Sequence, residues 1–125
     1  HLPTDAEWMM LERHLGMDAG ELEGLENWRG HAGELLKTGE QGIGFDALYG
    51  GAAVYALSTA YNSRYVYKNE GAYFWSSDQI VISDSLSNGI VRNISLYHSG
   101  IRRMTSRLIS TTENVRPSYS VRLVK

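Results

Sequence analysis

The apolar residues of this chain change their spacing once, close to Gly51. Before that point they recur at intervals of three and four residues, whereas after it they mostly alternate with polar residues. Helical segments followed by strands, without the alternation of strand and helix that builds a parallel sheet, predict an α+β fold with a mainly antiparallel sheet. The chain has 125 residues, enough for one packed core, so we expect a single domain over residues 1–125.

The clearest local signal is a helix that begins at Thr4. Thr4 and Glu7 have the spacing of a capping box, in which the hydroxyl accepts a hydrogen bond from a first-turn amide and the carboxylate reaches back. Gly16 is the expected end of this helix. Apolar side chains at helical spacing predict one buried stripe. They are Trp8, Leu11 and Leu15.

A second helix is expected after Gly16, because Asp18 and Glu21 repeat the spacing of a capping box. We expect it to end near Glu26 or Asn27. The stretch from His31 to Lys37 is short and contains a glycine, so it predicts no more than a helical turn. The glycine-rich stretch that follows, up to Gly51, carries apolar residues and predicts a tight loop packed on the core.

Beyond Gly51, segments of period two predict strands. Their ranges are Ala53–Leu57, Arg64–Lys68, Ala72–Trp75, Gln79–Ser83, Ile90–Tyr97, Arg107–Ser110 and Ser118–Val124. Short runs of turn-forming residues separate several of them and predict hairpin connections. These runs are Ser77-Asp78, Ser87-Asn88-Gly89 and Ser99-Gly100.

Charge is divided unevenly along the chain. Residues 1–50 carry three Lys or Arg against ten Asp or Glu, net −7, while residues 51–125 carry nine against four, net +5. In a chain of this size the simplest interpretation is that the two halves neutralise each other once folded. The alternative is a basic face for an acidic partner.

Six short stretches stand out in order along the chain. They are His-Leu-Pro-Thr-Asp-Ala-Glu-Trp at 1–8, Leu-Gly-Met at 15–17, Trp-Arg-Gly at 28–30, Gly-Phe-Asp-Ala-Leu-Tyr-Gly-Gly at 44–51, Tyr-Phe-Trp-Ser-Ser at 73–77 and Ser-Val-Arg-Leu-Val-Lys at 120–125. Together they resemble the Fibrobacter succinogenes major paralogous domain over nearly the whole chain. The chain departs from that pattern at Leu123, where Cys is common, and at Tyr49, where Pro is usual.

This resemblance implies two helices on an antiparallel, C-type-lectin-like sheet, with the two chain ends close together. It relates the chain to sulfatase-modifying-factor-like domains and to phage and bacterial variable proteins. It also implies an extracellular or cell-surface protein, often a lipoprotein, and a chain that begins inside a motif is expected to be a piece of a longer protein. Apolar positions within or near the motifs predict core residues. They are Leu2, Trp8, Leu11, Leu48, Trp75 and Val121.

The wider fold includes enzymes, whose chemistry needs side chains that this chain does not group. Oxygen-using relatives depend on paired cysteines, and the chain has no cysteine. Iron-dependent relatives need histidines beside a carboxylate, whereas the four histidines here are scattered. The calcium motifs of lectins are absent, and Ser76-Ser77-Asp78 has no histidine nearby. We therefore predict no catalytic residue, no metal site and no cofactor.

The strongest signal for binding is a cluster of tyrosines among small polar residues. Residues 59–73 hold four tyrosines with Asn, Ser, Arg and Gly, and residues 97–103 have a similar composition. Tyrosine offers rigid contact area and its small neighbours offer adaptable hydrogen bonds, as in antibody paratopes. The alternative is that alternating tyrosines simply cover one sheet face. The predicted contact residues are Tyr61, Asn62, Arg64, Tyr97, His98 and Arg102.

Two functions of different classes fit these observations. The first is a non-catalytic binding or adhesion domain that recognises a glycan or a protein ligand. The second is a structural module of a larger surface lipoprotein or fimbrial protein with no ligand of its own, and an enzyme with an unrecognised site is a weaker third. The slightly acidic composition argues against nucleic acid, and the absence of a long apolar run argues against membrane insertion by this domain.

Overall fold

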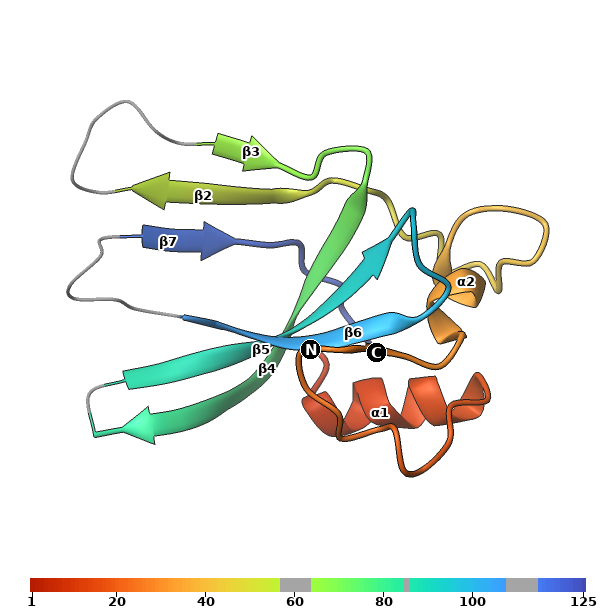
Figure 1. The fold of residues 1–125 in the computed structure, drawn as a ribbon, viewed down its shortest axis with the longest axis horizontal. Coiled ribbons are helices and arrows are strands. Elements are labelled where there is room, and N and C mark those ends of the chain that lie inside the picture. The colour runs from red at the N-terminus through yellow and green to blue at the C-terminus, as the bar shows by residue number, and fades with distance from the viewer. Residues whose placement is uncertain (57–63, 85, 108–114) are drawn as a thin grey trace.

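Two antiparallel sheets form the fold, and the N-terminal helix packs against one of them (Figure 1). The structure, a computed structural model, describes residues 1–56, 64–84, 86–107 and 115–125. The helices are α1, Asp5–His14, and α2, Ala32–Leu36. The strands are β1, Trp28–Arg29; β2, Ala52–Ala56; β3, Arg64–Val66; β4, Gly71–Ser83; β5, Leu86–Ser95; β6, Ile101–Arg107; and β7, Val115–Ser118.

The strand order is β1-β6-β5-β4 in the larger sheet and β3-β2-β7 in the smaller one. Every neighbouring pair of these strands is antiparallel. The expectation of two helices with a mainly antiparallel sheet is therefore confirmed.

Helix α1 begins where the sequence predicts. The Glu7 amide donates to Thr4 Oγ1 over 3.1 Å, and the Thr4 amide donates to Glu7 Oε2 over 2.8 Å, so both bonds of the capping box are present. After the helix, Gly16 adopts a φ of +94°, a conformation that glycine reaches at little cost.

The second predicted helix is wrong. Residues 18–26 form turns, and the second helix of the fold is α2 instead. Arg29 supplies the reason, because its Nη1 donates to the carbonyl oxygen of Leu22 over 2.6 Å and, more weakly, to that of Glu21. Two glycines in this stretch also cost about 1 kcal/mol each in a helix.

Two turn predictions and two strand predictions are also wrong. The strand predicted over Ser118–Val124 is β7, Val115–Ser118, and residues 121–125 lie outside any strand. Ser77-Asp78 is a shift of register inside β4 rather than a turn, and the shift brings the Asp78 carboxylate to the Asp5 amide at the start of α1. Ser87–Gly89 lies within β5, not in a turn. The sequence predicts a strand over Arg107–Ser110, whereas β6 begins at Ile101, because its arginines interrupt the alternation of apolar and polar residues. Residues 108–110 lie outside the described residues.

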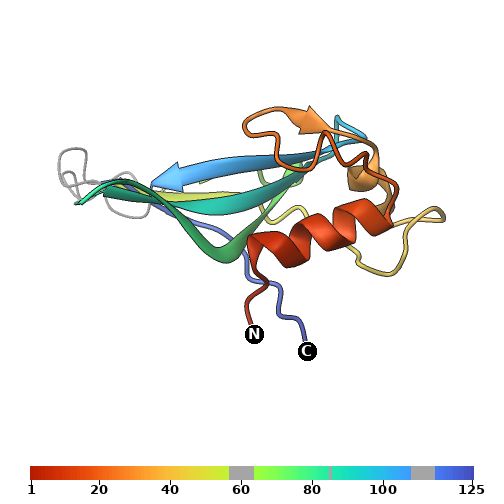
Figure 2. The ribbon, with the colours of Figure 1, turned by 90° about the horizontal axis from the view of Figure 1, so that it is seen from below.

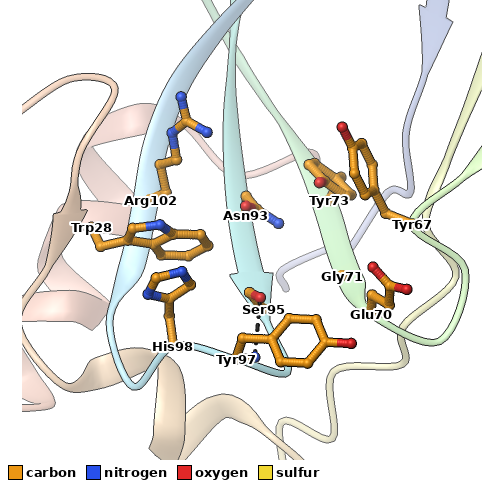
Figure 3. A pocket seen from close by; sticks show the side chains of 10 residues that line it. All are labelled: Trp28, Tyr67, Glu70, Gly71, Tyr73, Asn93, Ser95, Tyr97, His98 and Arg102. Atoms are coloured by element: carbon orange, nitrogen blue, oxygen red, sulfur yellow. Dashed lines mark hydrogen bonds between the residues drawn. The ribbon is translucent and has the colours of Figure 1, made fainter.

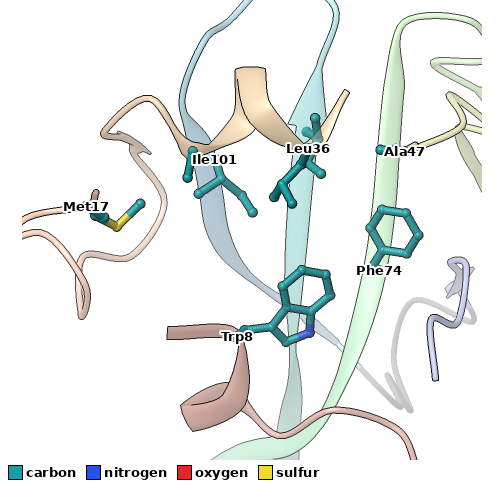
Figure 4. Close-up of a cluster of buried hydrophobic side chains, with 9 residues drawn as sticks. Trp8, Met17, Leu36, Ala47, Phe74 and Ile101 are labelled. Atoms are coloured by element: carbon teal, nitrogen blue, oxygen red, sulfur yellow. The ribbon is translucent and has the colours of Figure 1, made fainter. Parts of the chain in front are cut away.

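Helix α1 lies against one face of the larger sheet (Figure 2), and the core fills the space between the helices and this sheet (Figure 4). Trp8 is 2% exposed and packs beside Phe74, with ring centroids 6.0 Å apart. Trp75 is only half-buried, because neighbouring residues on a strand point to opposite faces and Phe74 takes the core side. Leu48 and Val121 are 78% and 57% exposed. The prediction that Trp75, Leu48 and Val121 are core residues is therefore wrong.

A buried ion-pair network fixes α1 on the sheet. Glu12 bonds Arg29 and Arg92, and all three side chains are fully buried. Asp5 bonds Arg92 and Arg103. Most of these pairs join an acidic residue of the first half to a basic residue of the second, as the division of charge predicts.

The chain ends lie together, as the resemblance implies (Figure 2). The amino group of His1 donates to the carbonyl oxygen of Val124 over 2.7 Å, and the Val124 amide donates to the His1 carbonyl over 2.9 Å.

Candidate functional site

One row of side chains crosses the larger sheet on the face opposite the core. Directly opposed residues of antiparallel strands project from the same face. The row contains one residue from each strand, and each residue pairs with the next across the sheet. It runs from Trp28 on β1 through Arg102 on β6 and Asn93 on β5 to Tyr73 on β4. The next row points into the core and consists of Arg29, Ile101, Ile94 and Ala72.

The outer row lines a hollow of about 250 Å³ (Figure 3). Its lining combines aromatic rings with hydrogen-bonding groups. The complete lining is Trp28, Tyr67, Glu70, Gly71, Tyr73, Asn93, Ser95, Tyr97, His98 and Arg102. A few polar groups placed among aromatic walls are the usual composition of a small-molecule site.

One wall consists of Trp28 and His98, whose rings stack with centroids 4.1 Å apart and an angle of 14° between their planes. His98 lies in the turn between β5 and β6, and Gly100 brings this turn close to β1. A Cβ atom at Gly100 would lie 2.7 Å from the Arg29 carbonyl oxygen, so the approach requires glycine. Arg102 lies on the same side and bonds Glu26 Oε2 over 3.0 Å.

The opposite wall includes Tyr67, which has a left-handed backbone with φ of +57°. A bulky residue in this region is strained, and such outliers concentrate at functional sites. The turn holds it there: the amides of Glu70 and Gly71 both donate to the Tyr67 carbonyl oxygen, over 3.1 and 3.0 Å.

Tyr73 lies between two other tyrosines. Its ring centroid is 6.0 Å from that of Tyr67 and 5.5 Å from that of Tyr119, on which it stacks. Burial raises the pKa of Tyr73, and the neighbouring Tyr67 and Tyr119 add to this effect. The phenol is therefore neutral near pH 7 and is available as a hydrogen-bond donor.

Asn93 is buried at the inner end of the hollow, and its amide orientation is set by the backbone. Its Nδ2 donates to the carbonyl oxygens of Ala72 and Ile94, over 3.2 and 3.4 Å. Because a carbonyl only accepts, the amide cannot be flipped, and Oδ1 is the atom left to accept a further hydrogen bond.

The structure brings three of the six predicted contact residues together. Tyr97, His98 and Arg102 all line the hollow. Tyr61 and Asn62 lie outside the described residues, and Arg64 is placed only by its backbone, which pairs with Val54 at the start of β3.

Sequence reasoning did not select the other lining residues. Tyr67 and Tyr73 belong to the tyrosine-rich stretch, so composition contained a signal for them. Trp28 lies in the Trp-Arg-Gly stretch and Glu70 in the tyrosine-rich stretch, but neither stretch predicts that these side chains meet. They and Asn93 reach the hollow through strand register and turn geometry.

Residues 1–56, 64–84, 86–107 and 115–125 contain no group of three or more His, Cys, Asp or Glu side chains that is arranged to hold a metal ion. No helix within these ranges has the length and apolar character to cross a membrane.

Fold and site together define a class of protein: a small α+β domain that carries an aromatic, polar hollow on the outer face of an antiparallel sheet. The chain belongs to the Fibrobacter succinogenes major domain family, whose model matches residues 1–125. No curated protein and no solved structure matches the chain.

Proposed function

We propose that this chain is a non-catalytic, extracellular or cell-surface binding domain that recognises a glycan or protein ligand through the hollow. The observation that carries the proposal is the convergence of Tyr97, His98 and Arg102 with Trp28 and Tyr73 around one cavity. Tyrosines and an amide with an open acceptor suit reversible recognition.

The dimensions of the hollow favour a sugar over an extended protein surface. A cavity of about 250 Å³ accommodates one ring-sized group, whereas a stable protein interface covers about 800 Å² on each partner. A sugar ring has apolar C–H faces that pack on aromatic rings and hydroxyl groups that bond polar side chains. The lining offers both kinds of contact.

The proposal of a non-catalytic role rests on how the polar groups are arranged. His98 is stacked on Trp28. His31 Nδ1 lies 3.1 Å from Ser99 Oγ, but both residues are exposed and neither lines the hollow. Within the described part of the chain no carboxylate bonds the His31 ring, so this pair lacks the orienting group of a catalytic triad.

We extend the proposal to the fold and the setting. A C-type-lectin-like fold is supported by the first motif, by two helices beside antiparallel sheets and by the pairing of His1 with Val124. An experimental structure superposed on such a domain tests the fold. Fractionation of cells that make the protein tests the surface location.

The binding proposal is tested with a glycan array, followed by titration of any hit. Tyr97→Ala is expected to weaken binding at least tenfold, because it removes one of the aromatic rings that line the hollow. Tyr65→Ala is the matched control: Tyr65 and Tyr97 are similarly exposed, at 73% and 70%, but only Tyr97 lines the hollow. No hit on glycan or protein arrays would contradict the proposal and favour the structural module.

A further inference from the structure

The hollow has one acidic lining residue, Glu70, at the turn before β4. Its side chain lies on the same side as Tyr67 and Tyr73, while Trp28 and Arg102 lie on the other (Figure 3). Within the described part of the chain, no hydrogen bond or ion pair engages the Glu70 carboxylate. A negative charge that no cation of the described residues bonds therefore borders the aromatic rings of Tyr67 and Tyr73.

The positive charge that lines the hollow is already matched. Arg102 Nη2 bonds Glu26 Oε2 over 3.0 Å, and Glu26 lies outside the lining. Among the described residues, the Glu70 carboxylate is therefore the charged group of the hollow that no ion pair neutralises, and a group of positive charge complements it.

The side chains around Glu70 suit an ammonium group in particular. Aromatic faces attract cations through the ring quadrupole, and Tyr67 and Tyr73 lie beside each other with centroids 6.0 Å apart. Asn93 Oδ1 adds an acceptor whose orientation is set by two bonds from the amide nitrogen. The carboxylate, the amide oxygen and the aromatic faces all interact favourably with a hydrogen-bond donor that carries a positive charge.

We propose that the hollow selects a sugar ring that carries a protonated amino group, that is, an amino sugar with an unacetylated amine. This inference rests on the proposed function and assigns its ligand class. An N-acetylated sugar ring carries no positive charge that could pair with Glu70, and an acidic sugar is repelled by it. Both are therefore expected to bind more weakly than the amino sugar.

The test is a titration of the chain, followed by NMR chemical shifts, with glucosamine, N-acetylglucosamine and glucose below the pKa of the amine. Glucosamine is expected to bind at least fivefold tighter than glucose, since hydrogen bonds between charged groups are stronger than neutral ones. This preference is expected to shrink as salt is added. Glu70→Gln is expected to bring the affinity for glucosamine down to that for glucose, because it removes the charge but keeps the size of the side chain.

Glu40→Gln is the matched control, because Glu40 is exposed and does not line the hollow. Equal affinity for glucosamine and glucose would overturn the inference while leaving the proposed function intact. A chain that binds none of the three sugars would also overturn the inference, and the arrays decide the proposed function separately. Binding of Nα-acetyl-lysine amide without binding of glucosamine would identify a protein side chain as the ligand and also overturn the inference.

Discussion

Glu12 of α1 accepts a hydrogen bond from Arg92 at the centre of the larger sheet, and both side chains are completely buried. Glu12 also accepts two hydrogen bonds from Arg29, each of 3.0 Å. One carboxylate thus joins the N-terminal helix, β1 and β5. Since a buried ion pair is costly to break, this network makes the position of α1 specific.

Glu12→Gln is expected to destabilise the domain by about 3–5 kcal/mol, because it leaves two buried guanidinium groups with too little negative charge. Urea denaturation measures the change in the free energy of unfolding. Glu40→Gln, at an exposed site, serves as the control and is expected to change stability by less than about 0.5 kcal/mol. A loss below about 1 kcal/mol for Glu12→Gln would mean that the network contributes little to stability.

Asp5 predicts a dependence of stability on pH. Burial by itself raises the pKa of the Asp5 carboxyl, but hydrogen bonds from Arg103 and Arg92 outweigh burial and hold the pKa below its ordinary value. A lowered pKa in the folded state stabilises the fold above the unfolded value of about 3.9, and this contribution is lost as the pH falls through the folded pKa.

Denaturation of the wild type is therefore expected to show a decline in stability below about pH 4. Asp5→Asn is expected to be less stable near neutral pH and to show a shallower decline in acid. An identical acid slope in both proteins would exclude Asp5 as a source of the decline.

Thr4→Ala is expected to cost about 0.5–2 kcal/mol, because it removes the hydroxyl that accepts from the Glu7 amide. Thermal melts measure the effect. Thr4→Ser keeps the acceptor and is expected to melt near the wild-type temperature, so equal losses in both variants would point to the lost methyl group rather than the cap.

Trp8→Ala and Trp75→Ala are expected to differ in cost, although both residues lie in family motifs. Trp8 is buried in the core and its removal is expected to cost about 3–5 kcal/mol. Trp75 is half-buried on the outer face, where its ring lies 4.8 Å from that of Tyr119, so its loss is expected to cost less. Denaturation of the two variants side by side decides this, and equal costs would contradict the assignment of the two faces.

Tyr67→Gly and Tyr67→Ala separate backbone strain from side-chain contact. Both remove the ring, but only glycine reaches a φ of +57° without strain, so the glycine variant is expected to be more stable by about 1 kcal/mol. Both variants are expected to lose affinity for a ligand of the hollow. If the alanine variant were the more stable one, the left-handed conformation would not be a source of strain.

Features whose partners lie close together in the chain could be predicted from the sequence alone. The capping box of α1 joins Thr4 to Glu7, and the end of the helix depends on Gly16 alone. The switch of period at Gly51 is enough to predict helices followed by antiparallel strands, because alternation follows directly from strand geometry. The local composition also predicts Tyr97, His98 and Arg102 as contact residues, and all three line the hollow.

Features whose partners are distant in the chain depend on the tertiary structure. Residues 18–26 have the capping signal of a helix, yet Arg29 binds their carbonyl groups and they form turns. Arg103 interrupts the apolar period of β6, and the Asp5 carboxylate compensates its charge. The hollow depends on register as well, since Trp28, Asn93 and Tyr73 meet Arg102 only when four strands pair in one alignment. A slip of one residue would turn each side chain to the opposite face, and that alignment is set by packing across the whole core rather than by any local stretch of sequence.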